Sequence, residues 1–167
     1  VSASNIHSDA EISSLAGNVN LEATDNIDVS AGRVSASAIN LDAGREARIG
    51  DTYIQAADVN VTAADVALGE SAIFSADTIV LDAAESFING ARIIGDDLNS
   101  DVRFTEDFTN LATGVYLWNA IELTISGQFT NAGWFEGSES IELTSAGFEN
   151  LSTGVITGGS VVVNASG

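Results

Sequence analysis

Short apolar strands recur along the chain at a nearly constant interval. The segments Val-Asn-Leu-Glu-Ala at 19–23 and Ile-Asn-Leu-Asp-Ala at 39–43 alternate apolar with polar positions, the period of two that is typical of a β-strand. Further segments continue the series at intervals of 20 or 21 residues. The central residues of the series are Leu21, Leu41, Val61, Leu81, Val102, Leu123, Leu143 and Val163. One repeat register therefore covers the whole chain.

Each interval contains two further strand-like segments. The first begins near Ile27, Ala47, Ala67, Phe87, Phe108, Phe129 and Phe148. The second is centred near Val34, Ile54, Phe74, Ile94, Tyr116, Phe135 and Ile156. No segment shows a sustained hydrophobic stripe of helical period or a convincing helix cap, so we expect almost no helix.

Three short strands in about 20 residues predict one coil of a solenoid, in which each strand pairs with its copy one coil later. The handedness rule for parallel connections favours a right-handed coil. We therefore expect an all-β, right-handed parallel β-helix of about eight coils, forming a single domain over residues 1–167. The chemistry of the repeat changes near residue 86 without a change of phase.

A Phe-x-Asn pair recurs from the fifth coil onward, and equivalent positions of a solenoid stack. The predicted internal ladders are Phe87, Phe108, Phe129 and Phe148, with Asn89, Asn110, Asn131 and Asn150 at the following corner. Stacked Phe rings bury a large area, and Asn amides both donate and accept along the axis. A structural role is therefore favoured over ligand binding for both columns.

One outward column is predicted to be apolar. If Tyr116, Phe135 and Ile156 point inward, the residue before each of them points outward. The resulting interaction stripe contains Tyr53, Ile73, Ile93, Val115, Trp134 and Val155. A continuous apolar stripe of this kind is typical of an interaction surface. The alternative is that the strand twists or bulges, so that the stripe belongs partly to the core.

Composition and charge narrow the possible partners. The chain has 24 carboxylate residues against five arginines, for a formal net charge of −19. Nucleic acid and anionic lipid attract clustered cations, so this charge argues against both as partners. No apolar run approaches the roughly 20 residues that span a bilayer, so we expect no membrane insertion. The absence of cysteine removes disulfides and thiolate sites.

Candidate catalytic chemistry is sparse. His7 is the single histidine and lies far from any nucleophile motif, so a Ser-His-Asp triad is not indicated and we expect no enzyme activity. In the acidic segment 93–103, Asp97, Asn99 and Asp101 place oxygen ligands on alternate residues, as the start of a Ca²⁺ loop does. The segment lacks the glycine and the final glutamate of an EF-hand loop. The alternative is an Asp/Asn turn that pairs with a neighbouring arginine.

The late repeats read FTNAGWFEGSESIELTSAG from Phe129 and FENLSTGVITGGSVVVNASG from Phe148. Their pattern F-x-N-x-x-x-G-x-I, followed by a Gly/Ser turn and a strand, resembles the filamentous-haemagglutinin-type repeats of large bacterial exoproteins. These include two-partner-secreted adhesins and the stalks of contact-dependent growth inhibition toxins. The resemblance covers 87–167 well and 15–86 through the shared period. The family's amino-terminal secretion domain carries Asn-Pro-Asn motifs, which this proline-free chain lacks.

The resemblance implies a β-helical section of a long rod that is secreted to the surface of a bacterium, with no catalytic residues to transfer. The leading hypothesis is therefore a structural or adhesive section of a cell-surface filament, expected to be a fragment of a longer rod. Its expected partners are an unidentified host or bacterial receptor or glycan, and neighbouring repeats.

Two alternatives remain open at this point. A glycan-binding or glycan-cleaving β-helix would show a groove with converging Asp residues and exposed Trp118 and Trp134. A self-stacking fibre subunit would instead pair its copies end to end through open strand edges.

The Ca²⁺ hypothesis makes a direct prediction. A metal bound by Asp97, Asn99 and Asp101 stabilises the folded state by mass action, so millimolar Ca²⁺ should raise the midpoint of thermal unfolding relative to EDTA. An unchanged midpoint at millimolar Ca²⁺ would refute the hypothesis.

Overall fold

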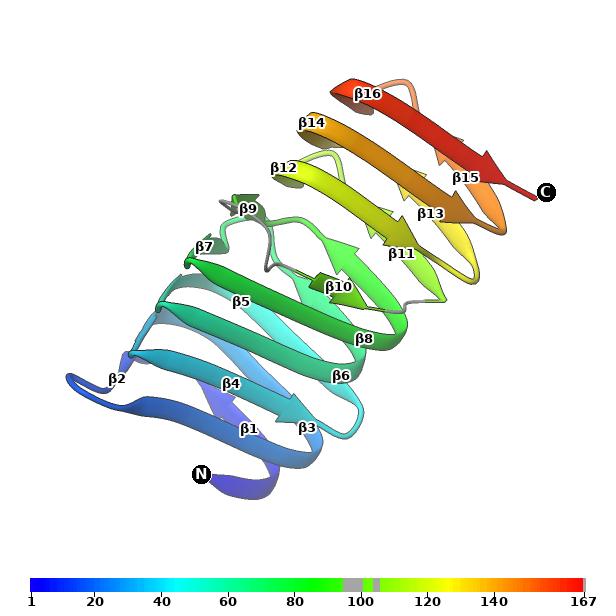
Figure 1. Ribbon diagram of the computed structural model, residues 1–167. Helices are drawn as coiled ribbons and strands as arrows, with labels where there is room; N and C mark the ends of the chain where they lie inside the picture. The colour runs from blue at the N-terminus through cyan, green and yellow to red at the C-terminus, as the bar shows by residue number, and fades with distance from the viewer. Residues whose placement is uncertain (95–100, 104–105, 167) are drawn as a thin grey trace.

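The computed structural model describes residues 1–94, 101–103 and 106–166, and these form one solenoid of stacked coils (Figure 1). The chain rises from the N-terminal to the C-terminal end in about eight turns of about 20 residues. The coil is right-handed, as Figure 1 shows. The described residues contain strands and turns and no helix, and every pairing between these strands is parallel. The predicted fold class is confirmed.

Three faces surround the core, and the longer strands bend at a corner to join two or three of them. The strands are β1 (Ser2–Ser8), β2 (Ile12–Ser13), β3 (Asn18–Ser35), β4 (Ala38–Ala43), β5 (Glu46–Gln55), β6 (Asp58–Leu68), β7 (Ile73–Ser75), β8 (Thr78–Asn89), β9 (Arg92–Ile94), β10 (Asp101–Arg103), β11 (Asp107–Asn110), β12 (Val115–Thr124), β13 (Gln128–Asn131), β14 (Trp134–Ser145), β15 (Gly147–Asn150) and β16 (Val155–Ala165). Face A contains β4, β10 and the strand segments that carry the column of Leu21. Face B contains β11, β13, β15 and the segments in the column of Phe87. Face C contains β2, β7, β9 and the segments in the column of Ile54.

The column of Leu21 keeps the register that the sequence predicts. Its paired members are Leu21, Leu41, Val61, Leu81 and Val102, and then Leu123, Leu143 and Val163. Leu41, Val61 and Leu81 are almost completely buried. Like side chains therefore stack on like along the axis, and face A closes one side of the core.

The assignment of Ala67 to the column of Phe87 is wrong by one residue. Val66 takes this place, because it pairs with Ala47 on one side and with Phe87 on the other and is almost fully buried. Ala67 instead pairs with Ile88 in an outward row. The turn ahead of Val66 is one residue shorter than the repeat predicts, and a one-residue shift in a strand reverses the face to which each side chain points.

A second shift of one residue occurs on face C. Ile93 pairs with Phe74 and with Tyr116 and is fully buried, whereas Ile94 is exposed. The prediction placed Ile94 in the inward column and Ile93 in the outward stripe, and both assignments are wrong. The turn ahead of Arg92 is one residue shorter than the period predicts, which again reverses the facing of the residues that follow.

The core changes from aliphatic to aromatic along the axis. The stacked rings of face B are Phe87, Phe108, Phe129 and Phe148. Ring centroids lie 5.1 Å apart between Phe87 and Phe108 and 5.2 Å apart between Phe108 and Phe129. From face C, the rings of Tyr116 and Phe135 each meet Phe108 edge-on at 6.0 Å. Phe108 therefore joins two faces of the solenoid.

Phe108→Ala should destabilise the solenoid strongly, because loss of a fully buried Phe side chain costs about 3–5 kcal/mol. Urea unfolding followed by circular dichroism measures the free energy of unfolding. Thr109→Ala is the matched control: Thr109 points outward from the same strand and should cost less than about 1 kcal/mol. Equal losses for the two variants would contradict the role assigned to the ring.

Candidate interaction surfaces

The predicted Asn column forms a continuous hydrogen-bonded ladder at the corner between faces B and C. The Nδ2 of Asn89 donates to the Oδ1 of Asn110 at 2.9 Å, and Asn110 donates in the same way to Asn131 at 2.7 Å. Asn131 then donates to Asn150 at 2.8 Å. Asn89, Asn110 and Asn131 are fully buried. The ladder satisfies amide groups inside the core, so these side chains are committed to structure rather than to a ligand.

The glycine of the F-x-N-x-x-x-G motif lies against this ladder. A Cβ added at Gly114 would collide with the side chain of Asn110 and with the carbonyl oxygen of Asn89. A Cβ added at Gly154 would collide with Asn150 in the same way. All three fixed residues of the motif therefore serve the interior, where only glycine allows so close an approach.

A second asparagine ladder lies on the outer surface of face A. The Nδ2 of Asn40 donates to the Oδ1 of Asn20 at 2.6 Å, and Asn60 donates to Asn40 at 2.8 Å. The ladder ends where Asn60 pairs with Val80. Sequence reasoning did not single it out, although the signal was present: three successive repeats carry Asn at one outward position.

Face C carries a stripe of apolar and aromatic side chains. Its column contains, in axial order, Arg33, Tyr53, Ile73, Arg92, Val115, Trp134 and Val155. Tyr53, Ile73, Trp134 and Val155 are exposed, and Val115 is half-buried. These five predicted members of the stripe lie on the outer surface of one face.

Arg92 interrupts the stripe at the place predicted for Ile93, which is buried. The adjacent outward column supplies apolar surface there, through exposed Ile94 and half-buried Leu117, which pair with each other. Sequence reasoning placed Ile94 in the core because the one-residue shift was not visible in a run of two isoleucines. It missed Leu117 because it considered one outward column only. We call the two outward columns together the face C stripe.

Arg33 lies at the N-terminal end of the stripe. Its guanidinium carbon sits 5.5 Å from the centre of the Tyr53 ring, within the range of a cation–π contact. Its Nη2 also donates a hydrogen bond to the side-chain oxygen of Gln55. These contacts hold the arginine across the surface of the next coil.

The two tryptophans do not form a shared surface. Trp134 is 44% exposed, and its Nε1 donates to Glu136 Oε2 at 2.7 Å. Trp118 is only 8% exposed and packs edge-on against Tyr116 with centroids 5.4 Å apart. Of the two exposed tryptophans that a glycan-binding β-helix would show, only Trp134 is therefore exposed.

The candidate Ca²⁺ residues Asp97 and Asn99 lie outside the described residues. The backbone of Asp101 begins β10 and pairs with Val80. Within the part of the chain that the structure describes, no three His, Asp or Glu side chains lie close enough to hold a metal ion. His7 pairs instead with Asp28 across one coil spacing at 3.2 Å, on the outer surface. The Ca²⁺ site stays a prediction.

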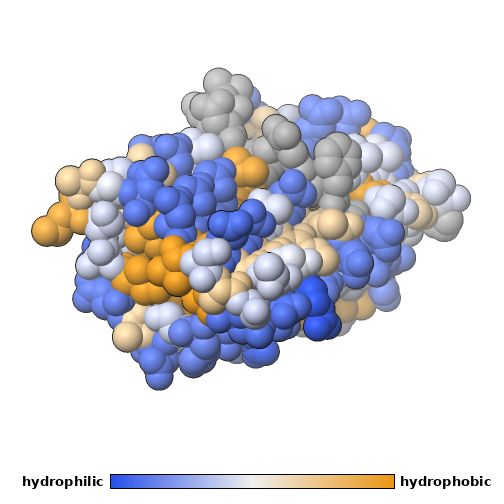
Figure 2. Space-filling view, turned by 90° about the horizontal axis from the view of Figure 1, so that it is seen from below, coloured by the Kyte–Doolittle hydropathy of each residue, from blue (hydrophilic) through white to orange (hydrophobic). Residues whose placement is uncertain are grey.

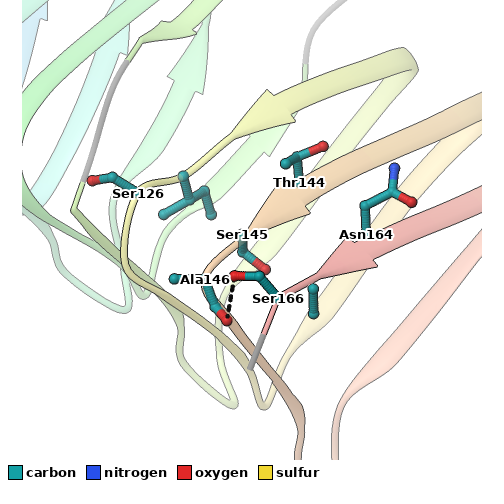
Figure 3. A pocket seen from close by; sticks show the side chains of 8 residues that line it. Ser126, Thr144, Ser145, Ala146, Asn164 and Ser166 are labelled. Carbon is teal, nitrogen blue, oxygen red and sulfur yellow. Dashed lines mark hydrogen bonds between the residues drawn. The ribbon is translucent and has the colours of Figure 1, made fainter.

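A groove of about 380 Å³ lies at the corner between faces A and B near the C-terminal end (Figure 3). It is lined by Ile125, Ser126, Thr144, Ser145, Ala146, Asn164, Ala165 and Ser166. Small Ser145 follows Ile125 in the inward column and leaves the space open. Ser166 Oγ donates to the carbonyl oxygen of Ala146 at 3.4 Å. None of the lining side chains is a carboxylate, histidine or cation, so the groove presents hydroxyl, amide and apolar groups.

Apolar surface also appears outside the face C stripe. In Figure 2, which views the molecule from below, the largest hydrophobic patch has hydrophilic surface around it. At the C-terminal end of the coil, Val161 and Val163 of β16 are exposed. Across the described residues, no helix is long and apolar enough to cross a membrane.

No protein-family model matches the chain, and neither the curated proteins nor the solved structures contain a significant match to it. The solenoid and its repeat are therefore established by the chain's own sequence and geometry.

Asn110→Ala leaves the side-chain amides of Asn89 and Asn131 without their partner inside the core. At roughly 1–3 kcal/mol for each buried group, it should lower the free energy of unfolding by about 2–6 kcal/mol. Asn40→Ala provides the control in the surface ladder, where water replaces the lost bonds and the cost should stay below about 1 kcal/mol. Urea unfolding of both variants measures the difference. Equal costs would show that burial of the inner ladder has no importance.

Proposed function

We propose that this chain is a structural or adhesive section of a secreted, cell-surface filament of the filamentous-haemagglutinin type. The observation that carries the proposal is the match between the repeat motif of that family and the geometry of the interior. In the repeats that begin at Phe108 and Phe148, the motif supplies one stacked ring, one rung of the Asn ladder and the glycine that fits against it. The motif therefore supplies the contacts by which one coil stacks on the next along the axis.

Axial growth is the property that a projecting filament needs. Each coil pairs with the coils before and after it, so further repeats lengthen the rod without enlarging its core. At about 4.8 Å per coil, eight coils give a rod roughly 40 Å long. The proposed role is to hold distance between a bacterial surface and a receptor or glycan on another cell or on matrix.

The surface chemistry supports an exposed rod in contact with water. Carboxylates such as Glu22, Asp42, Glu122 and Glu142 occupy outward positions of face A. With a net charge of −19, neighbouring rods repel each other through these rows, which favours solubility.

Antibodies raised against the folded chain should label intact cells of the organism that produces it. Protease added outside the cells should remove the label, because a filament section is accessible from the medium. Immunogold microscopy of intact and permeabilised cells makes the measurement, with a cytoplasmic protein of the same cells as the control. Labelling that requires permeabilisation would contradict the proposed function.

A further inference from the structure

The acidic charge of the chain is distributed unevenly over its three faces. Outward carboxylates of face A include Glu22, Asp42, Asp58, Asp82, Glu122 and Glu142. Outward carboxylates of face B are Asp28, Glu46, Asp65, Asp107 and Glu149. The face C stripe, from the coil of Arg33 to that of Val155, holds one carboxylate, Glu136, and two arginines, Arg33 and Arg92. Among the described residues, the two columns of the face C stripe are therefore apolar and carry no excess negative charge.

We propose that two copies of this chain pair side by side through the face C stripe, with their rods antiparallel. Copies with a net charge of −19 each repel unless the contact lies on a face that lacks the charge. Pairing through face C removes Tyr53, Ile73 and Trp134 from water and turns faces A and B of both copies outward.

The contact must be made by side chains. The backbone groups of the face C strands are already used in the ladders between coils, through Ile73 with Tyr53 and Arg92 on its two sides. A partner therefore cannot add a strand to this face. Two sheets can still pack face to face about 10 Å apart, as in a β-sandwich.

The positions of the charges decide the relative direction of the two rods. Arg33 lies in the second coil and Glu136 in the seventh, at opposite ends of the stripe. A twofold axis between the coils of Ile73 and Arg92 brings Arg33 of each copy opposite Trp134 and Glu136 of the other. Parallel pairing would instead leave both Arg33 and Glu136 without an opposite charge.

The remaining pairs in the antiparallel register are compatible. Tyr53 faces Val115 of the other copy, and Ile73 faces the aliphatic stem of Arg92, which can cover apolar surface while its guanidinium stays in water. Glu136 accepts from Trp134 through one carboxylate oxygen, so its second oxygen is available to the incoming guanidinium.

The size of the stripe sets the strength of the pair. Six overlapping coils span about 29 Å, and burial of this face on both copies removes on the order of 1,000 Å². This is at the low end for a specific interface, so we expect a dissociation constant of about 1–100 μM. Such a dimer forms where rods are crowded.

Sedimentation velocity across the micromolar range tests the pairing, at about 0.15 M salt so that long-range repulsion is screened. Ile73→Asp should weaken the dimer at least about tenfold, because it places a charge in the middle of the contact. Ile88→Asp is the matched control: both isoleucines point outward near the end of a strand, and they are 42% and 39% exposed, but Ile88 lies on face B. It should change the dissociation constant by less than about twofold.

A charge exchange tests the register. Arg33→Glu and Glu136→Arg should each weaken the dimer about fivefold or more, and the double variant should recover to within about threefold. The two residues of one copy lie five coils, or about 24 Å, apart, so a pair within the chain cannot explain the recovery.

The proposal is overturned by a protein that stays monomeric throughout the concentration range, by equal effects of Ile73→Asp and Ile88→Asp, or by a double variant as weak as the singles. Growth beyond the dimer would indicate end-to-end stacking and would overturn it too. Circular dichroism confirms the fold of each variant, and Tyr53→Asp replaces Ile73→Asp if the latter unfolds. The result is independent of where the protein resides, so it does not depend on the proposed function.

Discussion

The ladder of backbone hydrogen bonds along the axis is the interaction on which the rest of this structure depends. Each strand pairs in parallel with its equivalent one coil away, so the polar groups of a coil are satisfied by its neighbours rather than within it. Every side chain must then stack on its own equivalents. Leucine and phenylalanine meet this condition by shape, and asparagine meets it because its amide both donates and accepts. The absence of proline leaves every backbone N–H available to the ladder.

Because the inward columns carry the fold, the outward columns can differ from face to face. Faces A and B present rows of carboxylates, whereas face C presents Tyr53, Ile73 and Trp134 with two arginines. On such a rod, the side chains that can contact a partner are therefore arranged in rows along a face. The Phe-x-Asn repeat resembles a recognition motif when it is read as a sequence, yet its side chains are interior and build the rod itself.

The period of the sequence was enough to predict the coil, its three faces and both inner ladders, since like residues at a fixed interval leave one register. Ala67 and Ile93 were assigned to the wrong side of their strands because the turns before them are one residue shorter than the period predicts. The sequence does not reveal the shorter turn where both neighbouring residues, such as Val66 and Ala67, are apolar and could fill the inward position. Burial of Trp118 was predictable, because it lies two residues from inward-facing Tyr116. The low negative charge of face C could be recognised only in the corrected register. In that register Arg92 takes the outward position that was predicted for Ile93.

Hydrogen exchange of the backbone amides, followed by mass spectrometry, tests the central role of the axial ladder most directly. A coil with neighbours on both sides should open more rarely than a coil with a neighbour on one side. Protection should therefore peak in the middle coils, around the strands that carry Phe87 and Phe108, and fall toward β1 and β16 at the two ends. Uniform protection along the chain, or higher protection in the end coils than in the middle, would contradict the account.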